Sequence, residues 1–325
     1  MTPRADSRRA ASDPTRLLRV ARAHYLQGES MVSLADREGL SRWQIARILD
    51  EARSLGIVTI TVGDPAEYDE RLGEEVSELL GLKRTVVVGP TRRLGLEPSL
   101  DSVGGALAEY LTGQVREGQA VGLTWSRVIE SMAAQLGQLE PCDVVQLAGA
   151  LTLTGDRMGS VEVIRQVARV AQGTAYPLYA PMVVESPGVR RALELQEEIA
   201  SCLERSARLD LAVVSVGTWS ESGSSLYSQL PAELAQEVAD AGAVGEISGR
   251  VFGAEGEAVS DELDGRVLGI TSEQLRQVPH IVATSYGAHR AAATIVAARA
   301  GFAHTLIVDA PLARAIVRKL RGGHD

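Results

Sequence analysis

Residues 31–50 read Met31-Val-Ser-Leu-Ala-Asp-Arg-Glu-Gly-Leu-Ser-Arg-Trp-Gln-Ile-Ala-Arg-Ile-Leu-Asp50, a pattern typical of two short helices joined by a tight turn. Ala35 is small enough to let the two helices approach closely. Gly39, four residues later, adopts the turn conformation that a residue with a Cβ adopts less easily. Ser41 is a favourable N-cap for the second helix, and Gly56 can end it. The stretch therefore predicts a helix-turn-helix unit that binds DNA.

The second helix of this unit would present its polar residues at its N-terminal end. Its apolar positions lie on one helical face, and Trp43 and Arg47 point away from that face. In the major groove, arginine suits guanine and glutamine suits adenine. Trp43 either contacts a sugar or a thymine methyl group, or folds back over the helix. The predicted DNA-contacting residues are Ser41, Arg42, Trp43, Gln44 and Arg47.

The flanking sequence extends the motif to a DNA-binding domain over residues 13–62. Residues 1–12 are polar and charged without an apolar period, and we expect a disordered arm there. Asp13-Pro14 is a typical helix start, and apolar residues then repeat at helical spacing as far as Gly28. Ile57–Val62 resembles the short β extension of a winged helix. We predict an all-α winged helix-turn-helix. A winged helix used as a protein-interaction module is the alternative.

Charge is unevenly distributed along the 325 residues, whose formal net charge is −9. Residues 1–60 contain ten arginines and seven acidic residues, so the excess of acid lies in the rest of the chain. A mildly basic N-terminal region on an acidic remainder suits a regulator that meets DNA through that region alone.

Composition also excludes several classes of protein. No window approaches the ~18 uninterrupted apolar residues of a membrane span, and the N-terminus has no apolar signal stretch. Cys142 and Cys202 are two lone cysteines, and the five histidines show no metal-ligand spacing. We expect a cytoplasmic protein with no membrane partner, no metal site and no cofactor.

Beyond a charged segment over residues 63–82, predicted to be a helical linker, short β-rich runs alternate with helical segments. The predicted strands are 85–89, 120–124, 143–147, 210–216, 280–284 and 305–308, and the predicted helices include 99–115, 126–137, 160–172, 189–205, 231–241 and 288–300. Valine-rich strands separated by helices predict an α/β domain over residues 83–325, with a mostly parallel sheet covered by helices on both faces.

Polar loops follow two of these strands, where ligands bind in such folds. Residues 122–127 read Gly-Leu-Thr-Trp-Ser-Arg, and residues 284–290 read Thr-Ser-Tyr-Gly-Ala-His-Arg. Both lead into helices, whose N-termini favour an anion. Residues 245–247, Gly-Glu-Ile, add a carboxylate beside an expected glycine turn. Carboxylates hold hydroxyl groups, and arginine with helix amides holds phosphate, so this combination predicts a sugar phosphate site.

With both parts considered, the chain resembles the SorC family of sugar-responsive bacterial transcriptional regulators, from about residue 15 to about residue 319. The matching stretches are residues 40–58, 122–125, 145–149, 180–183, 245–247, 266–270 and 306–309. The resemblance implies an effector domain like glucosamine-6-phosphate deaminase and ribose-5-phosphate isomerase, and assembly into homodimers or homotetramers through that domain. The predicted effector-binding residues are Gly122, Thr124, Trp125, Ser126, Gly149, Glu246, Tyr286 and Arg290.

Three positions depart from the family pattern. Ser126 replaces the usual glycine, Arg290 replaces a common lysine, and Ala148 stands where many members carry Asn or Arg. Arginine keeps the charge but cannot form a Schiff base, so a covalent link to the effector through this position is not expected. Whether the effector is phosphorylated stays open.

We therefore expect a DNA-binding transcriptional regulator of carbohydrate or polyol catabolism genes, with operator DNA and a sugar, polyol or sugar phosphate as partners. One alternative is a sugar-phosphate isomerase or deaminase with an appended DNA-binding region. Such chemistry needs a general acid and a general base at one carbon, and Glu246 is a candidate that no paired carboxylate or His motif accompanies. We predict no catalytic residues and no enzyme activity. A DNA-binding architectural protein whose C-terminal domain binds no ligand is the other alternative.

Overall fold

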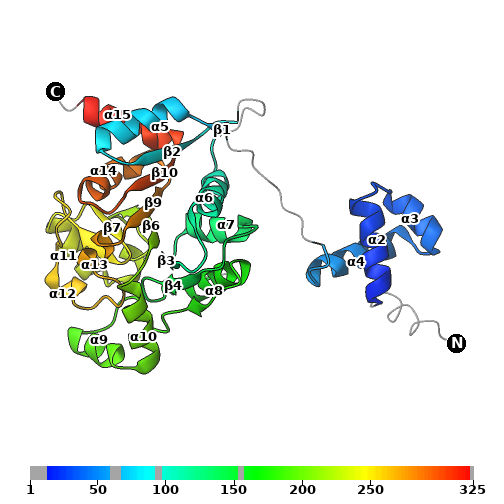
Figure 1. Cartoon of the computed structure of the whole chain (residues 1–325), viewed down its shortest axis with the longest axis horizontal. Helices are drawn as coiled ribbons and strands as arrows, with labels where there is room; N and C mark the ends of the chain where they lie inside the picture. The colour runs from blue at the N-terminus through cyan, green and yellow to red at the C-terminus, as the bar shows by residue number, and fades with distance from the viewer. Residues whose placement is uncertain (1–12, 59–66, 92–96, 153–156, 323–325) are drawn as a thin grey trace. The chain divides into compact units, whose positions relative to one another are not determined.

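The computed structural model describes residues 13–58, 67–91, 97–152 and 157–322, and the chain divides into two compact units (Figure 1). We call residues 1–62 the head and residues 63–325 the body. Each has a hydrophobic core of its own.

The described part of the head contains the helices α2 (Pro14–Tyr25), α3 (Met31–Glu38) and α4 (Arg42–Ser54). The side chains of Asp13, Ser30 and Ser41 cap their N-termini. Gly39 joins α3 to α4 with a left-handed φ of 65°. The head core is formed by Leu17, Val20, Ala21, Ala23, Leu34, Ala35, Ile45, Ile48, Leu49 and Ala52. The predicted helix start and the predicted helix-turn-helix are confirmed.

The predicted wing is covered only in part by the described residues. Ile57 and Val58 pack partly against the head core, and the Val58 N–H donates to the Ala52 carbonyl at 3.1 Å. Residues 59–62, which would complete the wing, and the predicted arm over residues 1–12 lie outside the described residues.

The body is built on one sheet with the strand order β1-β2-β10-β9-β6-β3-β4-β5. These strands are β1 (Glu67–Tyr68), β2 (Arg84–Gly89), β3 (Ala120–Leu123), β4 (Asp143–Gln146), β5 (Ala175–Tyr176), β6 (Leu211–Thr218), β9 (His280–Ser285) and β10 (Thr305–Asp309). All neighbouring pairs along this path are parallel except β1 with β2. The predicted mostly parallel sheet is confirmed.

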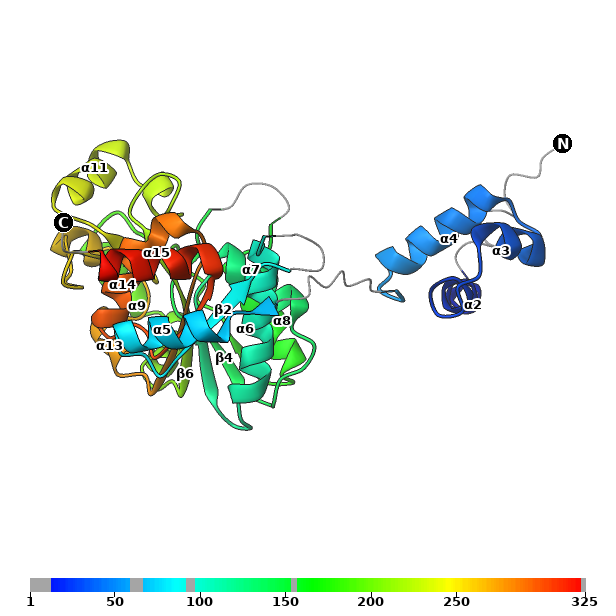
Figure 2. The same ribbon diagram turned by 90° about the horizontal axis from the view of Figure 1, so that it is seen from above.

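Helices cover both faces of the sheet, as predicted. One face carries α6 (Leu100–Gln114), α7 (Arg127–Gln135) and α8 (Ser160–Val170) (Figure 2). The other face packs against α5 (Glu70–Leu80), α10 (Glu197–Ser206), α13 (Ser272–Arg276), α14 (Ala291–Arg299) and α15 (Ala310–Arg321). The remaining segments are α9 (Pro187–Glu194), η1 (Tyr227–Gln229), α11 (Ala232–Asp240), α12 (Asp261–Asp264) and η2 (Ala288–Arg290).

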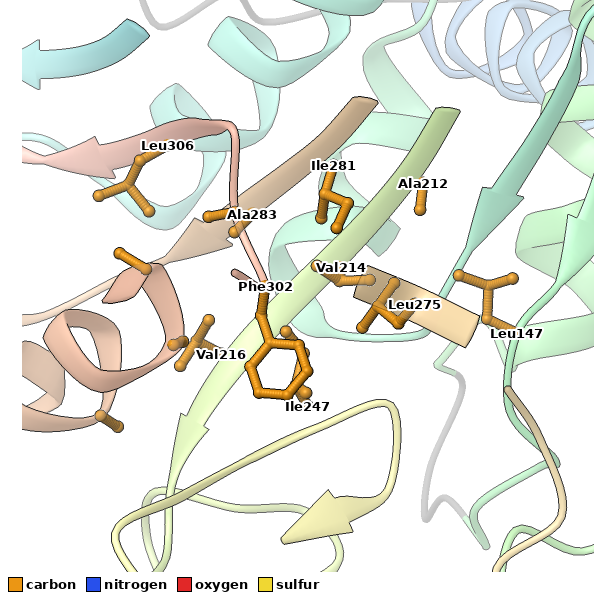
Figure 3. Packing of buried hydrophobic residues seen from close by; sticks show 14 of the residues in the cluster. Leu147, Ala212, Val214, Val216, Ile247, Leu275, Ile281, Ala283, Phe302 and Leu306 are labelled. Carbon is orange, nitrogen blue, oxygen red and sulfur yellow. The ribbon is translucent and has the colours of Figure 1, made fainter. Parts of the chain in front are cut away.

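The strands at the centre of the sheet divide their side chains between two cores. In β9, Ile281 and Ala283 face one core and Val282 faces the other, as the two-residue period of a strand requires. Figure 3 shows part of the first core, where Phe302 lies among side chains from β6, β7 (Gly245–Ile247) and β9. Because both faces are buried, these strands read as continuous apolar runs.

The segment predicted as a linker, residues 63–82, requires a correction. Its helix is present as α5, but Val76 and Leu80 are buried in the body core. A Cβ added at Gly73 would lie 2.5 Å from the Thr85 carbonyl oxygen, so α5 packs directly on β2. The helix is therefore part of the body and not a free linker, because the sheet buries its apolar face.

Three other predictions differ from the structure. Residues 189–205 form two helices, α9 and α10, and residues 288–300 form the short η2 followed by α14. The glycine turn expected at residues 245–247 is instead strand β7 (Gly245–Ile247), which pairs antiparallel with β6 and with β8 (Arg250–Phe252). The turn of this hairpin comes after Ile247.

Candidate functional site

The first candidate site is the N-terminal end of α4. Ser41 and Gln44 form a capping box: the Ser41 Oγ accepts the Gln44 N–H at 3.2 Å, and the Gln44 Oε1 accepts the Ser41 N–H at 2.8 Å. Two of the five predicted DNA-contacting residues therefore hold the helix start in the ligand-free chain. To accept a hydrogen bond from a base, the Gln44 carbonyl oxygen would have to share or leave the cap.

The other three predicted residues lie on the surface of α4. Arg42 and Arg47 are exposed, and the Trp43 side chain is 69% exposed. The Arg47 guanidinium lies 5.8 Å from the centre of the Trp43 ring. The indole therefore stands in solvent beside a cation and is not packed into the head core. The opposite face of α4 carries the buried Ile45 and Ile48.

The second candidate site is a cavity of about 250 Å³ at the carboxyl ends of β3, β6 and β9. Between β3 and β6 the chain winds in opposite directions, from β3 to β4 on one side and from β6 to β9 on the other. Parallel α/β sheets bind ligands at such a switch point. Six of the eight predicted effector residues line the cavity: Thr124, Trp125, Ser126, Glu246, Tyr286 and Arg290.

At the β3 end, hydroxyl groups converge on the start of α7. The Ser126 Oγ caps the helix by accepting the Ile129 N–H at 3.2 Å, and it accepts a hydrogen bond from the Ser215 Oγ at 2.7 Å. The Thr124 hydroxyl is buried and has no hydrogen-bond partner among the described residues. A buried hydroxyl of this kind is a strong candidate for a ligand contact, because leaving it unpaired costs free energy.

The β9 end contributes a constrained arginine. The Arg290 guanidinium donates to the Tyr286 carbonyl and, at 3.4 Å, to the Gly223 carbonyl. Burial, and then the like charge of Arg127, lower the pKa of Arg290. Arg127 is the first residue of α7 and also lines the cavity. Two arginines beside a helix N-terminus favour an anionic group.

Glu246 in β7 lines the same cavity. The Ser224 hydroxyl donates to its Oε1 at 3.3 Å, and the Gly249 N–H donates to the same carboxylate. Burial raises the pKa of Glu246 from its usual value near 4.5 to about 7, against the opposing effect of these donors and of Arg290. Near neutral pH this group is therefore divided between a proton-donating and a proton-accepting form.

Trp125 forms part of the cavity wall. Its indole N–H donates to the Met158 carbonyl at 2.8 Å, and the Arg157 guanidinium lies 4.9 Å from the centre of its ring. The ring is therefore fixed between α7 and the segment before α8, with an additional cation beside it.

The two predicted glycines do not line the cavity. A Cβ at Gly122 would lie 2.6 Å from the Leu147 and Leu209 side chains, and one at Gly149 would lie 2.5 Å from the Pro181 carbonyl oxygen. Both glycines allow close packing behind the cavity wall. Ala148, the third departure from the family pattern, is buried.

Several residues that line the cavity were missed. They come from the end of β6, from the segment after it and from the β7–β8 turn: Ser215, Gly217, Glu221, Ser222, Gly223, Ser224, Ser225, Ser228, Ser248 and Gly249. The run Ser-Glu-Ser-Gly-Ser-Ser at residues 220–225 was the available signal, because it begins four residues after the end of a predicted strand.

Neither site has the features of a metal centre. The described residues contain no group of three His, Cys, Asp or Glu placed to hold a metal ion. Within the described part of the chain, no helix is long and apolar enough to cross a membrane.

The chain is similar to known proteins along nearly its whole length. The family model described as "Putative sugar-binding domain" matches residues 64–318. The deoxyribonucleoside regulator of Bacillus subtilis (strain 168) is 28% identical over 307 residues, which cover 93% of this chain and 97% of that protein. The erythritol catabolism regulatory protein EryD of Brucella abortus (strain 2308) is 25% identical over 320 residues, 96% of this chain and 99% of that protein. The full-length sorbitol operon regulator SorC from Klebsiella pneumoniae has the same fold, with a TM-score of 0.70 and 19% identity over 93% of this chain and 98% of that chain.

Proposed function

Because the chain belongs to the SorC family of sugar-binding transcriptional regulators, we propose that the cavity of the body binds the small molecule that controls DNA binding by α4. The chain is a sugar-responsive transcriptional regulator and, like its relatives, not an enzyme. The proposed effector is a small sugar, polyol or sugar phosphate, and the proposed DNA target is the operator of a carbohydrate or polyol catabolism gene.

One observation supports this assignment above the others: the same cavity is lined by two arginines, a helix start and a buried carboxylate. Arg127, Arg290 and the start of α7 suit a phosphate or another anionic group. Glu246 and Ser224 suit the hydroxyl groups of a sugar or polyol. The cavity volume of about 250 Å³ suits a small sugar, polyol or sugar phosphate.

An effector changes DNA affinity only if it binds one state of the regulator better than the other. We propose that the two states differ in the arrangement of subunits, and hence in the spacing of the α4 helices over two operator half-sites. A homodimer or homotetramer assembled through the body would provide this spacing. Light scattering of the purified chain at several concentrations, with and without effector, would test the proposed assembly.

Fluorescence anisotropy would test the function directly. Labelled DNA from upstream of this gene and its neighbours would be titrated with the full chain, alone and with ribose 5-phosphate, fructose 6-phosphate, glucosamine 6-phosphate, erythritol or sorbitol. We expect tight, salt-sensitive binding that one of these compounds shifts. Salt-sensitive binding that none of them shifts would contradict the proposed role of the cavity.

Arg290→Ala links this response to the cavity. Removing a charge-assisted contact should raise the effector concentration needed for half-maximal response at least tenfold, while DNA affinity without effector stays near wild type. Arg165→Ala, an exposed arginine on α8, is the matched control and should respond normally. A normal response in Arg290→Ala would remove Arg290 from the effector site.

A further inference from the structure

The hairpin that carries Glu246 has an unusual residue in its turn. Ile247 of β7 pairs with Arg250 of β8, so Ser248 and Gly249 form a two-residue connection. Their φ angles are 55° and 81°, and two positive values define a type I′ turn. Asn, Asp or Gly normally fills the first of these positions, because they tolerate the left-handed region. A serine there carries a Cβ in a conformation that costs free energy.

The side chain of Ser248 forms no hydrogen bond among the described residues that would offset this backbone strain. Ser248 is 5% exposed, and its hydroxyl has no hydrogen-bond partner among the described residues. A buried, unpaired hydroxyl adds a second unfavourable contribution to the strained backbone. The Met182 and Val267 side chains lie next to this turn, since a Cβ at Gly249 would be 3.0 Å from the Met182 sulfur and 3.1 Å from Val267.

Ser248 differs in this respect from Gln172, the other described non-glycine residue with a positive φ, at 52°. Gln172 is exposed just beyond the C-cap of α8, where a left-handed residue commonly ends a helix. It does not line the effector cavity. Ser248 lines that cavity, two residues from Glu246 and on the same hairpin.

We propose that the Ser248 hydroxyl is an effector-contacting and specificity-determining group, which forms a hydrogen bond to a hydroxyl of the sugar or polyol bound beside Glu246. The inference rests on the proposed function of the cavity. It explains why a serine occupies a position that favours glycine: the unfavourable turn is kept because the hydroxyl is paired in the complex. Glu246 and Ser248 together would read neighbouring hydroxyl groups of one ligand, which selects for vicinal hydroxyls.

Two substitutions separate the hydroxyl from the backbone strain. Ser248→Ala removes the hydroxyl and keeps the Cβ, whereas Ser248→Gly removes both. Calorimetric titration of the full chain with ribose 5-phosphate, fructose 6-phosphate, glucosamine 6-phosphate, erythritol and sorbitol would be compared among these variants and wild type. For each compound that wild type binds, we expect both variants to bind about three- to tenfold more weakly, as the loss of one neutral hydrogen bond implies.

Thermal unfolding of the ligand-free variants provides a readout that needs no effector. We expect Ser248→Ala to raise the unfolding midpoint of the body, because it removes the buried unpaired hydroxyl. Ser248→Gly should raise the midpoint by about 2 °C more, because it also relieves the left-handed strain. Gln172→Gly is the matched control: it relieves the same kind of strain and should leave affinity for every compound unchanged.

The possible outcomes distinguish this inference from the proposed function. Wild-type binding of a compound with unchanged affinity in Ser248→Ala would overturn the role of Ser248 and leave the cavity assignment intact. A lower unfolding midpoint in Ser248→Gly would also overturn it, because the side chain would then support the ligand-free fold. If wild type binds none of the five compounds, the proposed function and this inference both fail.

Discussion

The head and the body hold their candidate functional side chains in opposite ways. In the head, the residues that would read DNA lie within seven consecutive positions of one helix, and most are exposed. In the body, the cavity gathers side chains from segments as far apart as residues 124 and 290, and the most informative of them are buried. A surface that reads DNA needs only a stable helix, whereas a cavity for a small polar ligand depends on the topology of the whole sheet.

This difference also affects the electrostatics. Burial raises the pKa of Glu246 and lowers that of Arg290, so both cavity groups have already lost much of their hydration before a ligand arrives. Arg42 and Arg47 are exposed and would lose their hydration only on the proposed binding to DNA. The following predictions test how far the two units are independent, from the largest expected effect to the smallest.

Phe302→Ala should have the largest effect and should be confined to the body. Phe302 is fully buried, and its ring centre lies 5.9 Å from that of Phe252. Truncation should lower the free energy of unfolding of the body by about 3–5 kcal/mol, through lost burial and the cavity left behind. The head transition should stay in place, because the head core contains none of these residues. Differential scanning calorimetry would measure both.

The half-exposed Tyr179 offers a control, and Tyr179→Ala should shift neither transition appreciably. A joint shift of the head and body transitions in Phe302→Ala would show that the two units unfold as one.

Glu246→Gln should change how body stability depends on pH. The pKa of Glu246 is raised to about 7 in the folded chain, so the folded state retains a proton that the unfolded chain releases near pH 4.5. Its contribution to stability is therefore fully present below about pH 4.5 and is lost as pH rises through about 7. Between about pH 5 and pH 8, wild type should lose on the order of 2 kcal/mol relative to Glu246→Gln. Urea unfolding of the ligand-free chain would measure this difference.

Glu233→Gln is the matched control, since Glu233 is exposed on α11. Parallel pH profiles for wild type and Glu246→Gln would show that the carboxyl does not titrate in this range.

Arg47→Ala should weaken operator binding about tenfold while leaving the head folded, because the side chain lies on the exposed face of α4. Arg53→Ala removes the same charge from the last turn of the same helix and should have a smaller effect. Anisotropy with specific and scrambled DNA would separate base contacts from phosphate contacts. Equal losses in the two variants would mean that Arg47 contributes only charge.

Ser41→Ala should have the smallest effect, a loss of about 1 kcal/mol in head stability through the capping box of α4. Thr271→Ala removes the equivalent cap from α13 in the body. The described core of the head is much smaller than that of the body. We therefore expect Ser41→Ala to lower the unfolding midpoint of the head by more degrees than Thr271→Ala lowers that of the body. Calorimetric comparison of the two variants tests this, and a larger shift in the body transition would contradict it.

Much of the fold could be predicted from sequence because its signals are local. The Asp13-Pro14 start, the Gly39 turn and the valine-rich strands each depend on a few neighbouring residues. The β7–β8 hairpin was missed because a strand of three residues shows no alternation that can be recognised. The break between α9 and α10 was missed because Leu195-Gln196 contains neither Gly nor Pro.

The cavity was predictable only in part. Thr124 and Arg290 follow recognisable strands, so their placement at the sheet edge could be inferred. Ser248 reaches the cavity through an antiparallel hairpin attached to β6, and no local signal indicates that approach. Gly122 was assigned to the effector because glycine allows close approach, and Gly149 because of the family resemblance, yet the neighbours that approach them are Leu147 and Pro181. A glycine in the sequence predicts that another group approaches closely, but it does not predict whether that group is a ligand or a neighbouring side chain.

The position of the cavity at the strand ends also bears on how such a regulator can diversify. Packing in the sheet is decided by side chains such as Val213 and Val282, which face the helices. Thr124, Ser222 and Ser224 lie in the connections beyond β3 and β6. Substitutions of these connecting residues leave the core packing unchanged. Ligand preference can therefore change during evolution with little effect on the stability of the fold.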